Sequence, residues 1–198
     1  MNILTRVFDF LKKKDMEKHY RQGGWRVEGP NGEIEKSREL ISDRRYARCL
    51  DVGAGLGHFT ELVSLMCDEV LAIDIAENAI LQTQKRLAHL KNVHFKVRNL
   101  REVGDTLGTF DLIILAEVLY YLGDERFPND FKRLLQQIAR IVRPNGRILL
   151  VNYIAPWRDE QKLREYEEIF ADSGLSLEKT ITHSARGKEF LISVLRSQ

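Results

Sequence analysis

The sequence predicts an α/β fold in which a mostly parallel sheet is covered by helices on both faces and ends in an antiparallel hairpin. From about residue 46 onward, continuous apolar runs of strand length alternate with amphipathic helical patterns, which is typical of a buried parallel sheet. The last third ends in two strand-like runs separated only by residues 183–188, and this spacing favours a hairpin over another crossover. A glycine-rich turn between the first strand and its helix completes the pattern.

The 198 residues suffice for one domain with a sizeable core, and no repeat, low-complexity tract or linker divides them. We therefore expect a single domain over residues 1–198, with an N-terminal helical or lid segment at 1–45 and the α/β core at 46–198. The expected strands span residues 47–52, 69–74, 93–97, 110–116, 147–153, 175–182 and 189–196. The expected core helices span about 59–66, 77–90, 129–142 and 159–172, and Arg143–Gly146 should end the third of them and turn into the next strand.

Residues 3–22 predict an amphipathic helix, because apolar side chains recur at helical spacing with Lys and Asp between them. These apolar residues are Ile3, Leu4, Val7, Phe8 and Leu11. We expect this face to pack on the domain, with a lid over a ligand pocket or a contact with a membrane surface as alternatives. A loop over residues 23–36 follows, in which Trp25 and Arg26 either anchor the loop or cover a ligand, and a helix at about 33–45 leads to the first strand.

The composition is that of an ordinary soluble globular protein, with 43% hydrophobic and 30% charged residues. A formal net charge of +2 does not favour a nucleic-acid-binding surface, which needs a concentrated basic face. No apolar run approaches the roughly 20 residues that cross a bilayer, and the lysines at 12–14 follow the N-terminal apolar residues, whereas a secretory signal places its charges first. We therefore expect a cytoplasmic protein without a membrane partner.

The two cysteines, Cys49 and Cys67, have no CxxC partner, and Cys49 lies in an expected buried strand. We expect both to be reduced in an intracellular protein, with a disulfide between them as the alternative. The five histidines show no metal-ligand spacing, so no metal site is expected.

Four stretches should converge at one edge of the sheet, because a ligand of an open α/β sheet lies outside the carboxyl ends of its strands. They are the glycine turn 53–57, the end of the second strand at Asp74, residues 99–100, and residues 116–120. Asp74 can accept two hydrogen bonds from a ribose diol, Ile75 offers an apolar surface to an adenine ring, and Asn99 can bond to that ring. The helix that begins after the turn presents free N–H groups that suit a carboxylate or phosphate.

The glycine spacing distinguishes two classes of ligand. A nicotinamide dinucleotide motif reads G-x-G-x-x-G, whereas Gly53, Gly55 and Gly57 give G-x-G-x-G. Asp51, two residues before the turn, would repel a pyrophosphate and attract the ammonium group of an amino acid. No Walker lysine follows the glycines. The pattern therefore favours S-adenosyl-L-methionine over NAD.

The stretch from Asp51 to Gly57 resembles the first motif of class I S-adenosylmethionine-dependent methyltransferases. Asp74, the strand from Phe110 to Ile113, and Arg143–Gly146 before the fifth strand are similar to later motifs of that family, over residues 45–195 in matching order. The resemblance implies a Rossmann-like three-layer sandwich with a seven-stranded sheet. It also implies the following cofactor-binding residues: Trp25, Arg26, Asp51, Gly53, Ala54, Gly55, Gly57, Asp74, Ile75, Asn99, Leu100 and Ala116.

In this resemblance Gly53, Gly55 and Asp74 bind the cofactor, Asp51 holds its amino group directly or through water, and Arg26 pairs with its carboxylate. Asn99 and Leu100 would border the adenine ring.

A closer similarity, carried by residues 116–122 with Trp25-Arg26 and Glu35-Lys36, is to the nodulation protein S-like branch. Members of that branch resemble N-methyltransferases that act on the free amine of a deacetylated chitin-type oligosaccharide. The resemblance implies a small-molecule or oligosaccharide acceptor, with an amine as its nucleophile. The sequence does not indicate the oligomeric state.

Glu117 and Tyr120 are the candidate catalytic residues, because an amine must lose its proton before it attacks and a carboxylate or phenol can take or relay that proton. The alternative role of Glu117 is a structural hydrogen bond to the N-terminal segment or to backbone. Alternative functions are O-methylation of a small molecule or an RNA end, and a non-catalytic S-adenosylmethionine-binding module. An oxidoreductase is disfavoured by the glycine spacing and Asp51.

Overall fold

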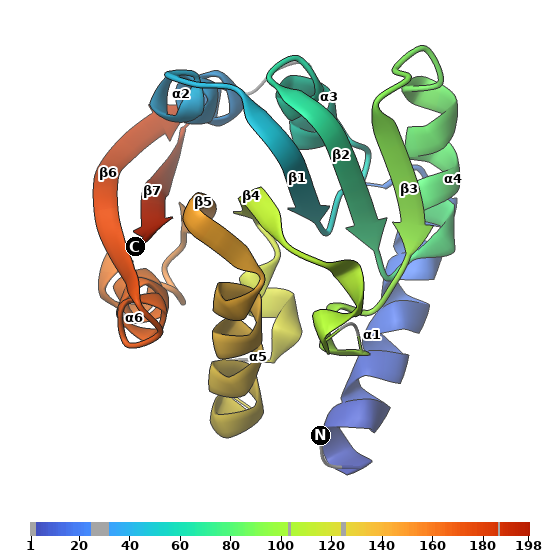
Figure 1. Ribbon diagram of the computed structural model, residues 1–198. Coiled ribbons are helices and arrows are strands. Elements are labelled where there is room, and N and C mark those ends of the chain that lie inside the picture. The colour runs from blue at the N-terminus through green and yellow to red at the C-terminus, as the bar shows by residue number, and fades with distance from the viewer. Residues whose placement is uncertain (1–2, 25–31, 103, 124–125, 186) are drawn as a thin grey trace.

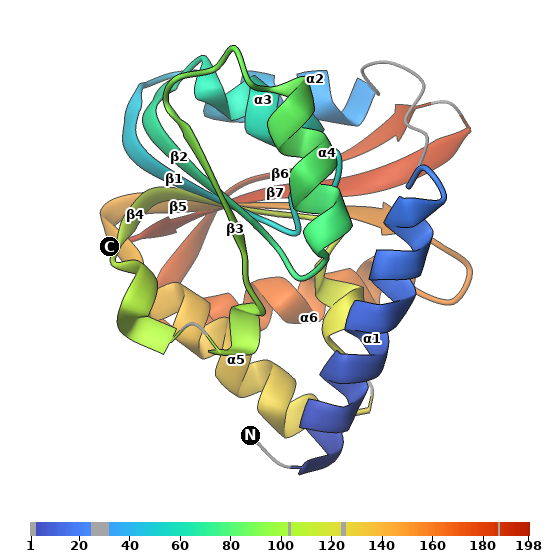
Figure 2. The ribbon, with the colours of Figure 1, turned by 90° about the vertical axis from the view of Figure 1, so that its right-hand side faces the viewer.

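The computed structural model describes residues 3–24, 32–102, 104–123, 126–185 and 187–198, and these form a three-layer α/β/α sandwich (Figures 1 and 2). Seven strands make one sheet in the order β3-β2-β1-β4-β5-β7-β6. The strands are β1 Tyr46–Val52, β2 Cys67–Asp74, β3 Val93–Val97, β4 Phe110–Ala116, β5 Val142–Ile154, β6 Leu175–Ala185 and β7 Lys188–Ser197. The first five pair in parallel and β7 pairs antiparallel with both β5 and β6, so the expected fold class is confirmed.

The helices lie on both faces of the sheet and across one end of it. They are α1 Ile3–Arg21, α2 Gly32–Ile41, α3 His58–Ser64, α4 Glu77–Arg86, α5 Pro128–Arg140 and α6 Glu160–Ala171, with short 3₁₀ turns η1 Leu100–Glu102, η2 Gly104–Leu107 and η3 Leu119–Leu122. Figure 2 shows α2, α3 and α4 on one face and α5 and α6 on the other, while α1 crosses the end of the sheet. None of the described helices is long and apolar enough to span a membrane.

Alternating side chains of the strands build one core layer on each face, as a doubly covered sheet requires. Leu50 and Ile113 pack toward α5 and α6 in one layer, whereas Val70 and Ile114 pack toward α2 and α3 in the other. All four side chains are buried. The core therefore fixes the sheet on both sides and leaves the carboxyl ends of its parallel strands to form a site.

The start of β5 differs from the expectation. Arg143–Gly146 does not form a separate turn before the strand but lies inside β5, where a register shift separates the pairs at Phe110 and Leu112. Asn145 adopts a left-handed φ of 62°, and a Cβ on Gly146 would lie 2.7 Å from the carbonyl oxygen of Arg143. An irregular strand thus takes the place of the predicted loop.

The expectation that the apolar face of α1 packs on the domain is wrong. Ile3, Leu4, Val7 and Leu11 are all at least half exposed, and only Phe8 of that set is half-buried. The opposite, more polar face turns inward, and Asp9 and Tyr20 are buried there. The reason is that α1 lies over a site that its polar side chains help to line.

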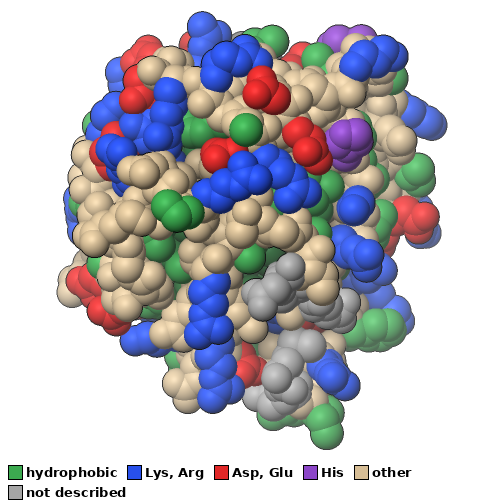
Figure 3. All heavy atoms as spheres, in the orientation of Figure 1, with side chains coloured by type: hydrophobic (Ala, Val, Ile, Leu, Met, Phe, Trp, Pro, Cys, Tyr) green, Lys and Arg blue, Asp and Glu red, His purple; other side chains and the backbone are tan. Residues whose placement is uncertain are grey.

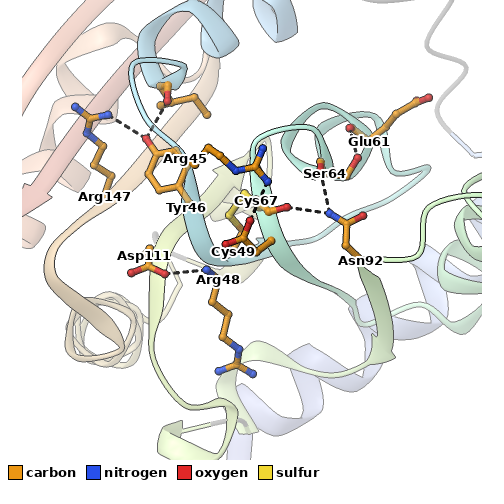
Figure 4. The surroundings of a disulfide bond; sticks show 12 residues. Arg45, Tyr46, Arg48, Cys49, Glu61, Ser64, Cys67, Asn92, Asp111 and Arg147 are labelled. Atoms are coloured by element: carbon orange, nitrogen blue, oxygen red, sulfur yellow. Dashed lines mark hydrogen bonds and ion pairs between the residues drawn. A yellow bond between two sulfur atoms is a disulfide. The ribbon is translucent and has the colours of Figure 1, made fainter.

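The expectation of reduced cysteines is also wrong, because Cys49 and Cys67 form a disulfide with 6.4 Å between their Cα atoms (Figure 4). The crossover from β1 through α3 to β2 returns the chain so that both side chains lie in one buried core layer. Asn92 supports this corner by donating hydrogen bonds from Nδ2 to the carbonyl oxygens of Ser64 and Cys67, each at 2.9 Å. The first two strands are therefore joined covalently.

Charged side chains are spread over the surface. Figure 3 shows Asp and Glu side chains between those of Lys and Arg on the face that it presents. This mixture agrees with the net charge of +2.

Candidate active site

A cavity of about 760 Å³ lies at the carboxyl ends of the parallel strands, within the size range of small-molecule sites. The turn after β1, the ends of β2 and β3, and the segments after β4 and β5 all contribute to its wall. One face of α1 and the start of α2 cover it from the N-terminal side. The sheet topology therefore brings together the four stretches that the sequence predicts to converge.

The glycine turn has a backbone that side chains would disrupt. Gly53, Gly55 and Gly57 have φ values of 71°, 55° and 80°, a region that L-residues rarely adopt. A Cβ on Gly53 would lie 2.7 Å from Cγ2 of Val118, and one on Gly55 would lie 2.9 Å from the hydroxyl of Tyr20. Gly53, Ala54 and Gly55 line the cavity, whereas Gly57 packs against α4 and is not among the described lining residues.

Asp74 connects the end of β2 to the glycine turn. Its carboxylate accepts hydrogen bonds from the backbone N–H groups of Gly55 and Ala76, each at 2.9 Å. Asp74 lines the cavity and is only 6% exposed. This burial raises the pKa of its carboxyl group above the ordinary value. A buried acceptor is thus fixed where the turn and the second strand meet.

Asp51 lies behind the turn and is not among the described lining residues. Its Oδ2 accepts a hydrogen bond of 2.5 Å from the hydroxyl of Thr60 on α3. Complete burial raises the pKa of Asp51 to about 6, and the nearby carboxylate of Asp74 acts in the same direction, against the hydrogen bond from Thr60. Any effect of Asp51 on a ligand in the cavity would therefore come from its charge and not from direct contact.

Ile75, Asn99 and Leu100 line the end of the cavity at β2 and β3. Asn99 donates a 2.9 Å hydrogen bond from Nδ2 to Oδ2 of Asp9 on α1, so its amide is already oriented by the helix. Ile75 and Leu100 give this end apolar walls, and the amide gives it a polar edge. Such a surface suits a flat heteroaromatic ring.

The face of α1 toward the cavity was not predicted from the sequence. Asp9, Lys12, Met16 and Tyr20 line the cavity. Their spacing of three, four and four residues places them on one helical face, which is the signal that could have identified them. The apolar residues on the other face dominated the sequence pattern and led to the opposite orientation.

The other end of the cavity, after β4, is formed around Ala116 and Glu117. Glu117 has a left-handed φ of 54°, which is uncommon for a residue with a side chain. Its Oε1 accepts a hydrogen bond from the backbone N–H of Tyr153, and its Oε2 accepts one of 3.2 Å from the hydroxyl of Tyr120. Burial raises the pKa of Glu117 above its ordinary value, in spite of these hydrogen bonds.

Two further charged residues of this end were missed by the sequence analysis. Glu33 from α2 and Arg158 from the segment after β5 both line the cavity and are 6% and 8% exposed. No motif marks either residue, because each reaches the site from an element that is distant in sequence. Trp25 and Arg26, which the family resemblance implies as cofactor-binding residues, lie outside the described residues.

The fold and the site define an α/β protein with a nucleoside-sized pocket at its first strand–helix turn. Residues 50–148, half of the chain, match the family model of a methyltransferase domain, and the chain therefore belongs to the methyltransferase domain family. This result confirms the family and the cofactor that the sequence motifs predict, S-adenosyl-L-methionine.

Among curated proteins, the chain is similar to nodulation protein S of Sinorhizobium fredii, with 33% identity over 129 residues, covering 63% of this chain and 58% of that protein. It is also similar to phosphoethanolamine N-methyltransferase 1 of Caenorhabditis elegans, with 33% identity over 82 residues, covering 38% of this chain and 16% of the enzyme. The chain spans about half the length of the nodulation proteins that it matches.

Among solved structures, the fold is similar to that of the N-methyltransferase NodS from Bradyrhizobium japonicum in complex with S-adenosyl-L-homocysteine. The TM-score is 0.78 at 20% identity, and the match covers 94% of this chain and 98% of the other. At this identity the likeness establishes the fold.

Proposed function

We propose that the protein transfers the methyl group of S-adenosylmethionine to an amine of a small-molecule or oligosaccharide acceptor. The observation that carries the proposal is that one continuous cavity extends from Asp74 and Asn99 to Glu117 and Tyr153. Such a cavity can hold a nucleoside at one end and an acceptor at the other. The similarity to proteins named as N-methyltransferases supports an amine as the nucleophile.

The cofactor end fits an aminoacyl nucleoside in its donor and acceptor groups. Asp74 supplies a buried carboxylate for a ribose diol, and Ile75 and Leu100 supply apolar walls for adenine. Gly53 and Gly55 place no side chain at these two positions of the turn, so the backbone there can approach the ligand closely. We propose that the negative charge of Asp51, a residue that is not among the described lining residues, attracts the amino group of the cofactor.

S-adenosylmethionine supplies an already activated methyl group, so the protein has to align the acceptor and exclude water. The acceptor nitrogen must be neutral in order to attack. Glu117 is suited to take a proton from that nitrogen, because its raised pKa makes it a better base than an ordinary carboxylate. Tyr120 holds Oε2 of Glu117 and shapes the wall beside it.

Calorimetric titration tests the cofactor half of the proposal. The protein should bind S-adenosylmethionine and S-adenosylhomocysteine and should not bind NAD. Asp74→Ala should weaken this binding by about 10- to 100-fold, the loss expected for hydrogen bonds to a charged group. Asp74→Asn tests the charge with less disturbance of the turn. Asp68→Ala, in the exposed part of the same strand, is the matched control and should leave binding unchanged.

Transfer of a labelled methyl group tests the acceptor half. Glucosamine oligomers with free amines should be labelled, whereas fully acetylated oligomers should not. Equal labelling of both would point to oxygen as the nucleophile. Absence of any response to S-adenosylmethionine and its demethylated product would refute the proposal as a whole.

A further inference from the structure

We propose that the acceptor carries an anionic group, a phosphate or a carboxylate, in addition to its amine, and that Arg158 binds this group. The inference rests on the proposed function, because it concerns the acceptor end of the same cavity. It adds a specificity-determining residue and narrows the acceptor from amines in general to amines that also bear a negative charge.

Arg158 is a buried cation that forms no ion pair in the described part of the chain, although its charge opposes the effect of burial that raises the pKa of the nearby Glu117. The residue is 8% exposed, and its Nη1 atom has no hydrogen-bond acceptor among the described residues. None of the ion pairs between described residues includes it. Buried charges in proteins are normally paired, because transfer of an unpaired charge out of water is very unfavourable. Since Arg158 lines the cavity, an anionic ligand is the partner that its position favours.

The guanidinium group is held in place rather than free to move to solvent. Arg158 closes a tight turn in which its N–H donates to the carbonyl of Ala155 at 2.8 Å and its own carbonyl accepts from Ala155 at 3.0 Å. Its guanidinium carbon lies 3.7 Å from the centre of the Tyr120 ring, a stacking geometry that suits Arg. A planar group fixed in this way can offer a fork of donors to phosphate or carboxylate oxygens.

Two carboxylates at the same end of the cavity complement the amine. Glu117 is tied to Tyr120, the ring on which Arg158 stacks, so the acid and the cation flank one tyrosine. Glu33 is 6% exposed, and its Oε2 atom has no hydrogen-bond donor among the described residues. The acceptor end thus presents two acids and one fixed guanidinium group, beside the exposed side chain of Lys188. This arrangement is complementary to a molecule with a cationic amine at one end and an anion at the other.

The test compares amines with the same two-carbon spacing that differ in charge: O-phosphoethanolamine, β-alanine and ethanolamine. Glucosamine 6-phosphate and glucosamine form a second pair on a sugar. Affinity is measured by calorimetry in saturating S-adenosylhomocysteine, so that the readout does not depend on turnover. We expect an anionic member to bind at least about tenfold more tightly than its neutral partner.

Arg158→Gln should remove this preference while S-adenosylhomocysteine still binds, which shows that the variant is folded. Arg158→Lys keeps the charge but loses the planar set of N–H donors of the guanidinium group. This variant should therefore retain part of the preference for anionic amines. The matched control Arg164→Gln, at a partly exposed arginine of α6 outside the cavity wall, should keep the preference in full. In methyl-transfer assays, Arg158→Gln should raise KM for the anionic acceptor much more than it lowers kcat.

Two results would overturn the inference: equal affinity for the charged and neutral members of both sets, or a preference that survives in Arg158→Gln. A protein that methylates neutral amines as well as charged ones retains the proposed function and loses only this inference. A protein that does not bind S-adenosylhomocysteine loses the proposed function, whereas an anion preference in the free protein would still support the role of Arg158.

Discussion

Glu117 makes contacts that serve the fold and also lies in the wall of the cavity, where the proposed chemistry would take place. One carboxylate oxygen accepts a hydrogen bond from the backbone of Tyr153, and the other is held by Tyr120. The left-handed backbone of Glu117 is of the kind that costs on the order of 1–3 kcal/mol and that persists at functional sites. The sequence allowed either a catalytic or a structural role, and the contacts provide the structural one while they leave the acid in the cavity wall.

At Asp51 the pKa leads to a prediction about pH. Since this pKa is about 6 in the folded protein, Asp51 is neutral below pH 6 and charged above it. A cationic amino group favours the charged form, so affinity for S-adenosylhomocysteine should fall by about tenfold between pH 7 and pH 5. The folding stability of the ligand-free protein should depend on pH in the opposite direction. Because the pKa of Asp51 is raised in the folded state, its contribution to stability decreases as pH rises from about 4 to 6.

Calorimetric titration across this pH range measures the first effect, and thermal denaturation of the free protein measures the second. Asp51→Asn should bind more weakly and show a shallower pH dependence, with Asp74 responsible for what remains. The same steep dependence in Asp51→Asn and in the native protein would exclude a role for the charge at position 51.

The presence of Asp74 and Asn99 in the cavity wall could be predicted from the sequence, because each lies at or just after the end of a strand. Asp74 and Asn99 are local features of single strand–loop units, so their meeting at one edge follows from the parallel sheet alone. Glu33 and Arg158 could not be found in this way. Their presence in the site depends on the packing of α2 and on the turn after β5, neither of which has a sequence signature.

At the scale of elements, α1 is attached through polar contacts. Asp9 forms an ion pair of 3.3 Å with Arg101 and accepts a hydrogen bond from Asn99. Near its other end, Glu17 accepts hydrogen bonds from the backbone N–H groups of Glu77 and Asn78, at 2.6 and 3.1 Å. A carboxylate at the first turn of α4 is favourable in the field of that helix. The existence of α1 was predictable from periodicity, but its orientation depends on these distant partners.

We expect Asp9→Ala to loosen α1 while the core stays folded. The side chain of Arg101 is only 3% exposed, and loss of its anion leaves a buried charge, a change that typically costs about 3–5 kcal/mol. Amide hydrogen exchange should become faster in α1, the buried strands should keep their protection, and cofactor affinity should fall. Asp15→Ala, at an exposed position of the same helix, is the control. Unchanged exchange in α1 would mean that other contacts hold the helix.

At the scale of the whole molecule, strand number, the parallel arrangement and the final hairpin were all predictable, because buried strands and amphipathic helices leave strong local patterns. The irregular start of β5 was not, since Arg143–Gly146 has the composition of a turn and is drawn into the sheet by pairing with β4. The disulfide was not predictable either. It depends on the return of β2 beside β1, whereas the spacing of two cysteines in the sequence says little.

The disulfide should contribute measurably to global stability. A crosslink that closes a loop of about 15 residues stabilises by about 3 kcal/mol in the chain-entropy model, which corresponds to about 6–12 °C in Tm for a chain of this size. Thermal denaturation with and without reductant should show that difference. Cys49→Ala/Cys67→Ala should melt at the lower temperature with or without reductant. Two thiols that react in the unreduced, denatured protein would contradict the crosslink.

The crosslink has a further consequence for chain integrity. The segment between Cys49 and Cys67 contains the whole glycine turn and α3. In the oxidised protein this segment is a closed covalent ring, and the proposed cofactor site includes the glycine turn of this ring. A single peptide-bond cleavage inside the ring would leave two fragments that still migrate together in electrophoresis without reductant. Electrophoresis would therefore reveal proteolytic cleavage of the glycine turn or of α3 only after the disulfide is reduced.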